Sequence, residues 1–515
     1  MRLCRLISVF LLLLLVGCGE PRDPVPLVSA ARTGTSTSHW TGTPAAVEYY
    51  APAHPYMAAQ GRNSMHSDSF NSDVHPSGGP VGENTTMVSR KGTRAPGGQC
   101  ANMLMSSEQR VLVLCAGITG FRIQMLEHRT LRLLADYKLP NRSSTWQSLW
   151  HRDKRYVMED SSGAYFYLDH EDRVVVADNV QRIHRIAHQQ SSTGQWEFVV
   201  ENLWDLSSVV PGECFRPTYL FPDGECDQIT ALLPDYHGLI WWVTRGGRVG
   251  TLNTKTGGLQ SVTLADEEIQ NGFAVARDGV YIVSDHALYA FHADSEGVPV
   301  VRWQESYDRG SARRLGAINQ GSGTTPTLMG DHYITLTDNA DGRSNLLVYK
   351  RTGSEHDAGR LLCKQPVFQP GRSVAENSMI AVGRTILLEN NTGYTSAEEQ
   401  KDWSEVGGGI VRIDLREDES GCDVIWESQE RIPSVVAKLA ARTGIAYYYT
   451  FEENETDTNA WYLIGIDINS GETVFRIYTG NGAAFNNNWA PIALTQDGTA
   501  YIGTSKGLLA LWDST

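Results

Sequence analysis

Carboxylate, amide and imidazole side chains recur in this sequence just before and just after short apolar runs. Asp285 and His286 follow one such run, Glu389 and Asn390 follow another, and Asn271 precedes a third. Oxygens of this kind suit a hard cation when they converge, and Ca²⁺ takes six to eight of them. We therefore expect a Ca²⁺ site built from these side chains: Asn271, Asp338, Asn339, Glu376, Asn377, Glu389 and Asn390.

A Ca²⁺ ion in such a place can polarise a carbonyl or activate water, which is the chemistry of a lactonase- or esterase-like hydrolase or of a lyase. The titratable pair beside it that could act as the catalytic base is Asp285 and His286. Asp, Asn and Ser are also the ordinary residues of strand ends and turns. A solvated polar funnel without an ion therefore remains open, and a non-enzymatic protein that binds a ligand or partner protein is our first functional hypothesis.

The apolar runs belong to a repeated unit of strand, Gly or Asp turn, second strand, and two further strands. First strands are expected to begin near residues 101, 164, 228, 272, 326, 378, 435 and 490, at intervals of about 44 to 64 residues. Each unit is a small sheet with two apolar faces, which radial packing of neighbouring sheets buries. The sequence therefore predicts an all-β fold, a β-propeller of about eight four-stranded blades over residues 100–515.

The last unit runs out of sequence before a fourth strand. A strand at about residues 81–90 can supply it and close the ring. A seven-bladed ring with an extra sheet, or two stacked domains, remain as alternatives. In a propeller the first strand of each blade starts on the face where the second strand ends, so the polar residues named above are expected to line one funnel.

Two turns resemble those of PQQ-like-repeat propellers: Gly465-Ile-Asp-Ile-Asn-Ser-Gly and, more weakly, Gly250-Thr-Leu-Asn-Thr-Lys-Thr-Gly. That family includes quinoprotein dehydrogenases as well as binding and scaffold proteins without a cofactor. No adjacent cysteine pair is present to contact the cofactor, so PQQ is unlikely on this resemblance. The ring of Glu, Asn and Asp also resembles that of six-bladed calcium lactonases, from which the expected blade number departs.

The first residues have the layout of an export signal. Arg2 and Arg5 precede an apolar run over residues 6–16 that is too short to span a membrane. The run ends in Leu15-Val16-Gly17-Cys18, which resembles the lipobox of bacterial lipoproteins. The resemblance implies that residues 1–17 are removed, that Cys18 carries the lipid that anchors the protein to the membrane, and, because Gly19 is not Asp, that this is an outer membrane. A plain signal peptide with a chance cysteine is the alternative.

Six cysteines remain after Cys4 and Cys18, an even number that suggests disulfides in an oxidising compartment: Cys100, Cys115, Cys214, Cys226, Cys363 and Cys422. Six cysteines allow fifteen pairings. The first two flank an expected hairpin and the next two close a short loop, which leaves the last two as a pair. No CxxC spacing occurs, so zinc is not favoured.

The formal charge of −15 disfavours nucleic acid as a partner, and leaves an envelope protein or a small molecule. Residues 18–45 are rich in Pro, Ser, Thr and Gly and are expected to form a linker. Residues 46–99 are polar and turn-rich but contain Tyr, Met, Phe and His. We expect them to pack irregularly on the propeller; a His/Asp metal site or a lid over the funnel remain as alternatives.

Overall fold

The computed structural model describes residues 28–29, 51–92, 98–117, 120–140, 144, 150–152, 163–210, 212, 227–315, 320–353, 359–396, 399–454 and 458–514. Cys18, the signal segment, most of the linker and the pair Cys214 and Cys226 lie outside these ranges, so the predictions made for them stay predictions. Within these ranges no helix is long and apolar enough to cross a membrane.

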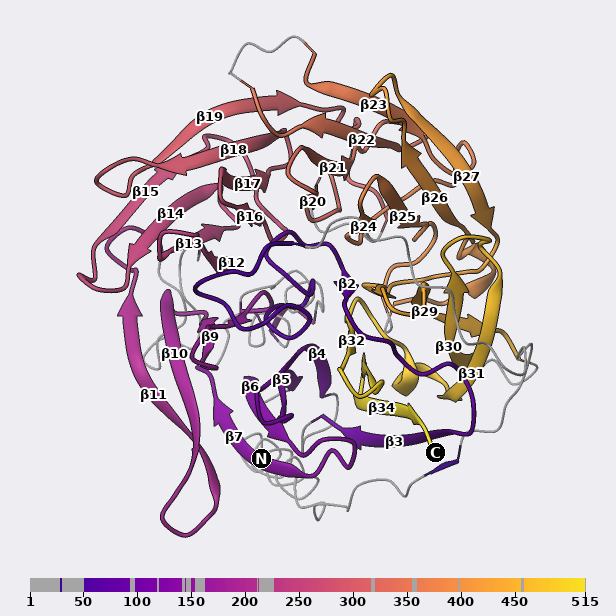
Figure 1. Cartoon of the computed structure of the whole chain (residues 1–515), viewed down its shortest axis with the longest axis horizontal. Coiled ribbons are helices and arrows are strands. Elements are labelled where there is room, and N and C mark those ends of the chain that lie inside the picture. Colours follow the sequence, from indigo (N-terminus) through magenta and orange to yellow (C-terminus); the bar gives the residue numbers. More distant parts are fainter. Residues whose placement is uncertain are drawn as a thin grey trace, which may run out of the picture.

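Eight sheets stand in a ring, each with its first strand towards the centre and its last strand towards the rim (Figure 1). Blade 1 consists of β4 (Gln99–Met105), β5 (Val111–Gly117), β6 (Gly120–Leu126) and β7 (Leu133–Lys138), and blade 2 of β8 (Tyr167–Leu168), β9 (Val174–Ala177), β10 (Arg182–Gln190) and β11 (Trp196–Asp205). Blade 3 consists of β12 (Ile229–Pro234), β13 (Leu239–Thr244), β14 (Arg248–Asn253) and β15 (Leu259–Thr263), and blade 4 of β16 (Ala274–Ala276), β17 (Gly279–Val283), β18 (Ala287–Ala293) and β19 (Pro299–Ser306).

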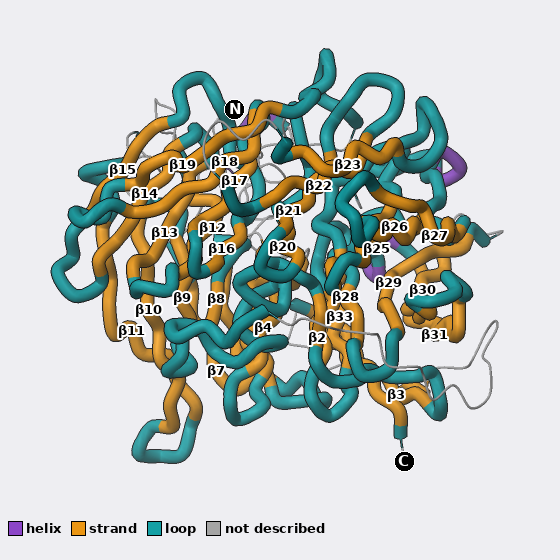
Figure 2. Tube along the Cα trace, turned by 45° about the horizontal axis from the view of Figure 1, so that its top comes forward, coloured by secondary structure: helices purple, strands orange, loops and turns teal. Residues whose placement is uncertain are grey.

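The other four blades complete the ring. Blade 5 consists of β20 (Thr327–Met329), β21 (Tyr333–Thr337), β22 (Asn345–Lys350) and β23 (Leu361–Pro366), and blade 6 of β24 (Ile380–Val382), β25 (Thr385–Glu389), β26 (Ile410–Leu415) and β27 (Cys422–Ser428). Blade 7 consists of β28 (Lys438–Ala440), β29 (Ile445–Glu452), β30 (Ala460–Asp467) and β31 (Thr473–Asn481), and blade 8 of β32 (Ile492–Leu494), β33 (Ala500–Thr504), β34 (Gly507–Asp513) and β3 (Thr85–Lys91). Besides helical residues at 144 and 150–151, the described helices are two short 3₁₀ turns, η1 (Trp403–Glu405) and η2 (Ala483–Phe485), which Figure 2 shows against strand and loop.

The structure confirms the predicted all-β propeller of eight four-stranded blades, and each inner strand begins within a few residues of its expected position. The inner and second strands are nearly all buried, as in β17, β21, β25 and β33. Outer strands alternate or are exposed, because one side of the blade faces solvent there. The two turns that resemble PQQ-like repeats join the third strand to the outer strand, in β30–β31 and β14–β15.

The ring is closed by a strand from the beginning of the chain, as predicted. Strand β3 pairs antiparallel with β34 over its whole length, from Thr85 opposite Asp513 to Lys91 opposite Gly507. Met87 and Val88 of β3 are buried. Closing a blade with strands from both ends of the chain joins the termini through backbone hydrogen bonds and leaves no blade open. A two-residue strand, β1 (Val28–Ser29), pairs with the outer side of β3.

The central channel is filled by residues 51–80, which we call the plug; Figure 1 shows this segment crossing the middle of the ring. Its carbonyl groups accept hydrogen bonds of 2.7–3.0 Å from the N–H of the middle residue of four successive inner strands: Val275 donates to Ser69, Leu328 to Phe70, Ala381 to Ser72 and Leu439 to Asp73. Strand β2 (Val74–His75) continues this contact by pairing parallel with β28. The plug therefore satisfies the inner edges of blades 4 to 7, which would otherwise be unpaired strands.

The polar composition of the plug has a conformational cause. Ser67, Asn71 and Asp73 have φ angles of 74°, 56° and 55°, a left-handed region that Asn and Asp tolerate better than apolar residues do. The buried carboxylate of Asp68 accepts from the backbone N–H groups of Phe70 (2.9 Å) and Ser72 (3.1 Å) and so holds the turn. These turns aim consecutive carbonyl groups outward at different blades.

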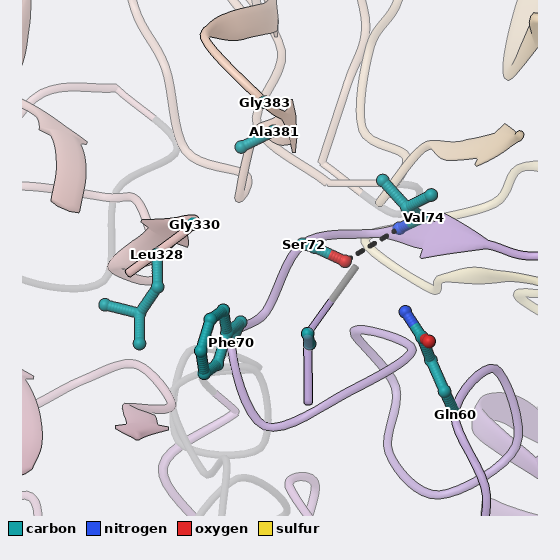
Figure 3. Close-up of a pocket in the computed structure, with 9 residues that line it drawn as sticks. Gln60, Phe70, Ser72, Val74, Leu328, Gly330, Ala381 and Gly383 are labelled. Atoms are coloured by element: carbon teal, nitrogen blue, oxygen red, sulfur yellow. Dashed lines mark hydrogen bonds between the residues drawn. The ribbon is translucent and has the colours of Figure 1, made fainter. Parts of the chain in front are cut away.

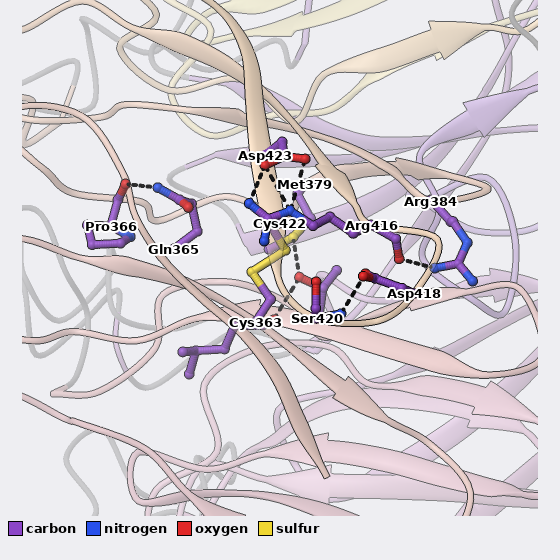
Figure 4. The surroundings of a disulfide bond; sticks show 12 residues. Cys363, Gln365, Pro366, Met379, Arg384, Arg416, Asp418, Ser420, Cys422 and Asp423 are labelled. Atoms are coloured by element: carbon purple, nitrogen blue, oxygen red, sulfur yellow. Dashed lines mark hydrogen bonds and ion pairs between the residues drawn. A yellow bond between two sulfur atoms is a disulfide. The ribbon is translucent and has the colours of Figure 1, made fainter. Parts of the chain in front are cut away.

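Two of the predicted disulfides lie within the described residues, and both are present. Cys100–Cys115 joins directly opposed residues of β4 and β5. Cys363–Cys422 joins the outer strands of two blades, β23 and β27, beside the exposed pair of Arg416 and Asp423 (Figure 4). The first bond strengthens one hairpin, whereas the second connects neighbouring blades at the rim.

We expect the double variant Cys363→Ser/Cys422→Ser to be less stable by about 2–4 kcal/mol, because its unfolded chain gains the freedom that this long loop otherwise loses. Urea denaturation followed by tryptophan fluorescence measures the change. Cys100→Ser/Cys115→Ser is the matched comparison, and its smaller loop predicts a smaller loss. Equal stability of the inter-blade variant and the parent protein would contradict this expectation.

Candidate functional site

The predicted site residues all lie at one end of the channel, where inner strands start and second strands end. We call this the funnel face, and the opposite side, which carries the turns between first and second strands, the turn face. The plug enters from the turn face: Tyr236 in the β12–β13 turn donates to the Pro52 carbonyl, and the His54 ring lies 4.2 Å from the Tyr236 ring. The plug thus forms the floor of the funnel.

The predicted catalytic pair is part of a three-residue cluster. Asp285 accepts from His286 Nδ1 at 2.9 Å, from the Glu268 N–H at 2.7 Å and from Arg309. Arg309 also donates from Nη1 to His286 Nε2, at 2.8 Å. Because a guanidinium only donates, the Nε2 lone pair is the acceptor and Nδ1 carries the proton. In this arrangement His286 has no free lone pair, and Arg309 must move before the imidazole can take a proton.

Of the predicted metal ligands, those in blade 5 are engaged in turns. Asp338 accepts from the N–H of Asn345 (2.7 Å), from the Asn345 side chain (2.7 Å) and from the Ala340 N–H. Asn339 donates to the Arg309 carbonyl at 3.0 Å. Asn271, in the neighbouring blade, donates to the Ser322 carbonyl over a long distance of 3.5 Å.

The residues in blade 6 form a buried hydrogen-bonded set. Glu389 Oε1 accepts from Asn377 Nδ2 at 2.6 Å and from Asn391 Nδ2 at 3.0 Å. Burial raises the pKa of Glu389 to about 8 against these bonds, and the negative charge of Asp73 in the plug adds to the rise. The Asn390 side chain is hydrogen-bonded to backbone groups: its oxygen accepts from the N–H groups of Val374 and Thr392, and its nitrogen donates to the carbonyl groups of Arg372 and Gly408.

Glu376 is the second buried carboxyl group of blade 6. Burial raises the pKa of Glu376 to about 8, and the positive charge of Arg314 opposes that rise. Arg314 itself donates to backbone carbonyls of blades 5 and 6, those of Ala340 and Ser373. Burial thus makes both glutamates release a proton less readily than an ordinary glutamate does.

These two carboxyl groups predict how stability depends on pH. Their folded pKa values lie above the ordinary 4.5, so the folded state binds more protons than the unfolded state between about pH 4.5 and pH 8. Stability is then expected to fall as pH rises through this window. Glu389→Gln should weaken that dependence, which denaturant titrations at pH 5 and pH 8 measure. The same slope in the variant and the parent protein would refute the assignment for Glu389.

The calcium prediction stays a prediction. No three His, Cys, Asp or Glu side chains come together as a metal-binding group in the part of the chain that the structure describes. If the funnel holds no ion, EDTA leaves the melting temperature of the protein unchanged. A melting temperature that falls with EDTA and recovers with Ca²⁺ would instead support a bound ion.

The floor of the funnel contains Lys438 and Ser378, which the sequence reasoning missed as site residues, beside His66 and Asp73, which it had considered for a His/Asp metal site. Lys438 contacts Asp73 of the plug, with side-chain exposures of 4% and 1%. His66 Nδ1 lies 3.0 Å from Asp73 Oδ2, and Ser378 Oγ donates to the same oxygen at 2.8 Å. One signal was available in the sequence: Lys438 is a lone charge within the otherwise apolar run 435–441, and a buried lysine requires a partner.

The turn face has a shallow hollow of about 260 Å³, including space open to solvent, between the plug and the turns of blades 5 and 6 (Figure 3). Phe70, Val74 and Leu328 contribute apolar walls, and Gly330 and Gly383 form its edge. Only a small part of this volume could hold even a water-sized molecule, so the hollow is not a ligand pocket of the usual size. It gives no reason to place the functional site on this face.

No protein-family description matches the chain, and no curated protein does. Solved structures do share the architecture. BamB from Moraxella catarrhalis is 11% identical, with 81% of this chain and 94% of that chain covered and a TM-score of 0.41. The computationally designed Ika8 protein is 12% identical, with 81% and 98% covered and a TM-score of 0.45. Chaetomium thermophilum Sqt1, bound to the N-terminus of ribosomal protein L10, is 9% identical, with 90% and 100% covered and a TM-score of 0.47. What these proteins have in common with this chain is the propeller fold.

Proposed function

We propose that this protein is an extracytoplasmic propeller, tethered to the outer membrane by lipid on Cys18, that binds a ligand or a partner protein through its funnel face. The observation that carries the proposal is the plug. The chain arrives from Cys18 at Ala51, which lines the turn-face hollow, and the plug then occupies the channel from that side. In the part of the chain that the structure describes, the plug leaves the funnel face open to a partner.

The chemistry of the funnel face also favours binding over catalysis. Its carboxylates and amides are mostly engaged with each other or with backbone, and the His286 lone pair is held by Arg309. Exposed groups remain around it, among them Leu315 with 65% of its surface exposed and the solvent-facing Asp341. The two disulfides support an oxidising compartment, where such bonds persist.

Photo-crosslinking in intact cells tests the proposal. A photoreactive amino acid is placed at Leu315 or Asp341 on the funnel face, or at the exposed Ala59 of the plug on the turn face. We expect discrete adducts from the funnel positions and none from Ala59, and we expect Cys18→Ser to move the protein out of the membrane fraction and to lower the adduct yield. Adducts that arise only from Ala59 would show that the partner binds the turn face and not the funnel face. An unchanged membrane fraction for Cys18→Ser would show that lipid on Cys18 does not tether the protein.

A further inference from the structure

An amine and a carboxyl group are held together in the interior where the plug meets blade 7. The backbone fixes the two residues first: the Leu439 N–H donates to the Asp73 carbonyl at 2.9 Å, and Val74 lies opposite Leu439 in the parallel β2–β28 pair. The Lys438 side chain then reaches Asp73, and Nζ contacts Oδ1. Side-chain exposures of 4% and 1% show that bulk water is excluded from the contact.

The second oxygen of the Asp73 carboxyl group is held by two donors. His66 Nδ1 lies 3.0 Å from Oδ2, and the Ser378 hydroxyl donates to it at 2.8 Å. His66 Nδ1 also lies 3.2 Å from Oδ1, and because both of its carboxylate neighbours are acceptors, this nitrogen carries the proton. A carboxyl carbon with an amine on one side and two donors on its far oxygen has the arrangement that stabilises the tetrahedral stage of acyl transfer.

The loss of hydration on burial also favours an amide over an ion pair at this contact. A buried ammonium and carboxylate have each given up their hydration, and their attraction only partly compensates for that loss. A neutral amide with one N–H and one C=O has far less hydration to give up, and its oxygen keeps the two donors already in place. Once the water released by the condensation has left, bulk water does not return to the contact, so the reverse reaction lacks its second reactant.

We propose that Lys438 and Asp73 condense to an intramolecular amide, an isopeptide bond that ties the plug covalently to the inner strand of blade 7. The Lys438 ammonium first gives a proton to Asp73 Oδ1, which leaves a neutral amine and a neutral carboxylic acid. The nitrogen lone pair forms a bond to Cγ while the carbonyl electron pair moves onto Oδ2, facing His66 and Ser378. A second proton passes from the nitrogen to Oδ1, the Cγ–Oδ1 bond breaks, and one water leaves. Nothing is oxidised or reduced, and no co-reactant is needed.

The bond would close a loop across a sequence separation of 365 residues and make the plug a permanent part of the propeller. It would also carry any pull on the N-terminal tether into blade 7 without relying on the two-residue pairing of β2. A reversible ion pair at the same place would leave the plug free to exchange when the protein is denatured.

Peptide mapping of the purified full chain tests the proposal. Trypsin cleaves after Arg62, Arg90, Arg431 and Arg442, so the predicted product is peptide 63–90 joined to peptide 432–442, lighter than their sum by one water and uncleaved at Lys438. We expect this branched peptide in reduced and denatured samples, with fragmentation placing the link at Asp73. Recovery of the unlinked peptide 432–438 in full yield from folded protein would overturn the proposal and leave an ion pair.

Variants separate the bond from the fold. Lys438→Arg keeps the buried cation but removes the nucleophilic amine, so it is expected to lose the branched peptide while retaining the circular dichroism spectrum of the parent protein. Ser378→Ala removes one donor from Oδ2 and is expected to slow the appearance of the branched peptide after refolding from urea. A branched peptide that persists in Lys438→Arg would show that the assigned amine is wrong.

Discussion

A chain that begins at residue 98 is expected not to fold as a cooperative unit, whereas a chain that begins at residue 51 is expected to fold normally. The shorter chain lacks β3, which supplies the outer strand of blade 8, and lacks the plug, which satisfies the inner strands of blades 4 to 7. It would leave an unpaired edge on β34 and a buried lysine, Lys438, without its carboxylate. Circular dichroism melts and size-exclusion chromatography of the two chains measure the difference.

A matched pair of substitutions tests the β3 contribution in the full chain. Val88 is 4% exposed in β3, while Ser89, the next residue, faces partly towards solvent. Val88→Asp buries a charge and is expected to lower the melting temperature sharply, and Ser89→Asp is expected to have little effect. Similar melting temperatures for both variants, or a cooperative melt of the chain from residue 98, would show that β3 is not required to close the ring.

Trp461→Ala is expected to cost about 3–5 kcal/mol of stability, near the upper end for a core substitution. Trp461 is completely buried in blade 7, and its Nε1 donates to the Gly482 carbonyl at 3.0 Å. Its ring lies parallel to that of Tyr449, with centroids 5.6 Å apart, and edge-on to that of Trp403 at the same separation. Alanine would leave a cavity beside the rings of Tyr449 and Trp403, and the Gly482 carbonyl would keep only the hydrogen bond from the Phe485 N–H.

Urea denaturation with two variants resolves the two contributions. Trp461→Phe keeps an aromatic ring but loses the hydrogen bond, so its loss of stability should be clearly smaller than that of Trp461→Ala. Trp426→Ala is the control on the rim, because Trp426 is only partly buried and lies on the outer strand β27. A loss for Trp461→Ala no larger than that for Trp426→Ala would mean that the cluster contributes little to the fold.

The blade pattern could be read from the sequence because its causes are local. Alternating apolar residues and Asp-Gly turns such as Asp278-Gly279 and Asp497-Gly498 specify hairpins within a dozen residues. The disulfide Cys100–Cys115 followed from the same pattern, because both cysteines sit on one hairpin, whereas Cys363–Cys422 was predicted as the pair that remained. The last unit contains only three predicted strands, which would leave an open edge, so a fourth strand was expected from residues 81–90.

The site could be predicted only as a location. The sequence placed Asp285, His286, Glu389 and Asn390 at one end of the channel, because strand direction alternates regularly within each blade. It gave no information on which lone pairs remain free. That depends on Arg309 reaching His286 and on Asn377 and Asn391 reaching Glu389, contacts set by loops whose paths no periodicity describes.

By itself, then, the sequence determined the architecture of this protein: β-strands in eight repeated units, closed by a strand from the opposite end of the chain. Only the tertiary structure decided what fills the centre. The plug meets its partners across separations such as 255 residues for Asn71 and Pro326 and 365 residues for Asp73 and Lys438. A strand repeats its pattern every two residues and can be recognised locally, whereas a segment that bonds one carbonyl to each of several blades has no period of its own.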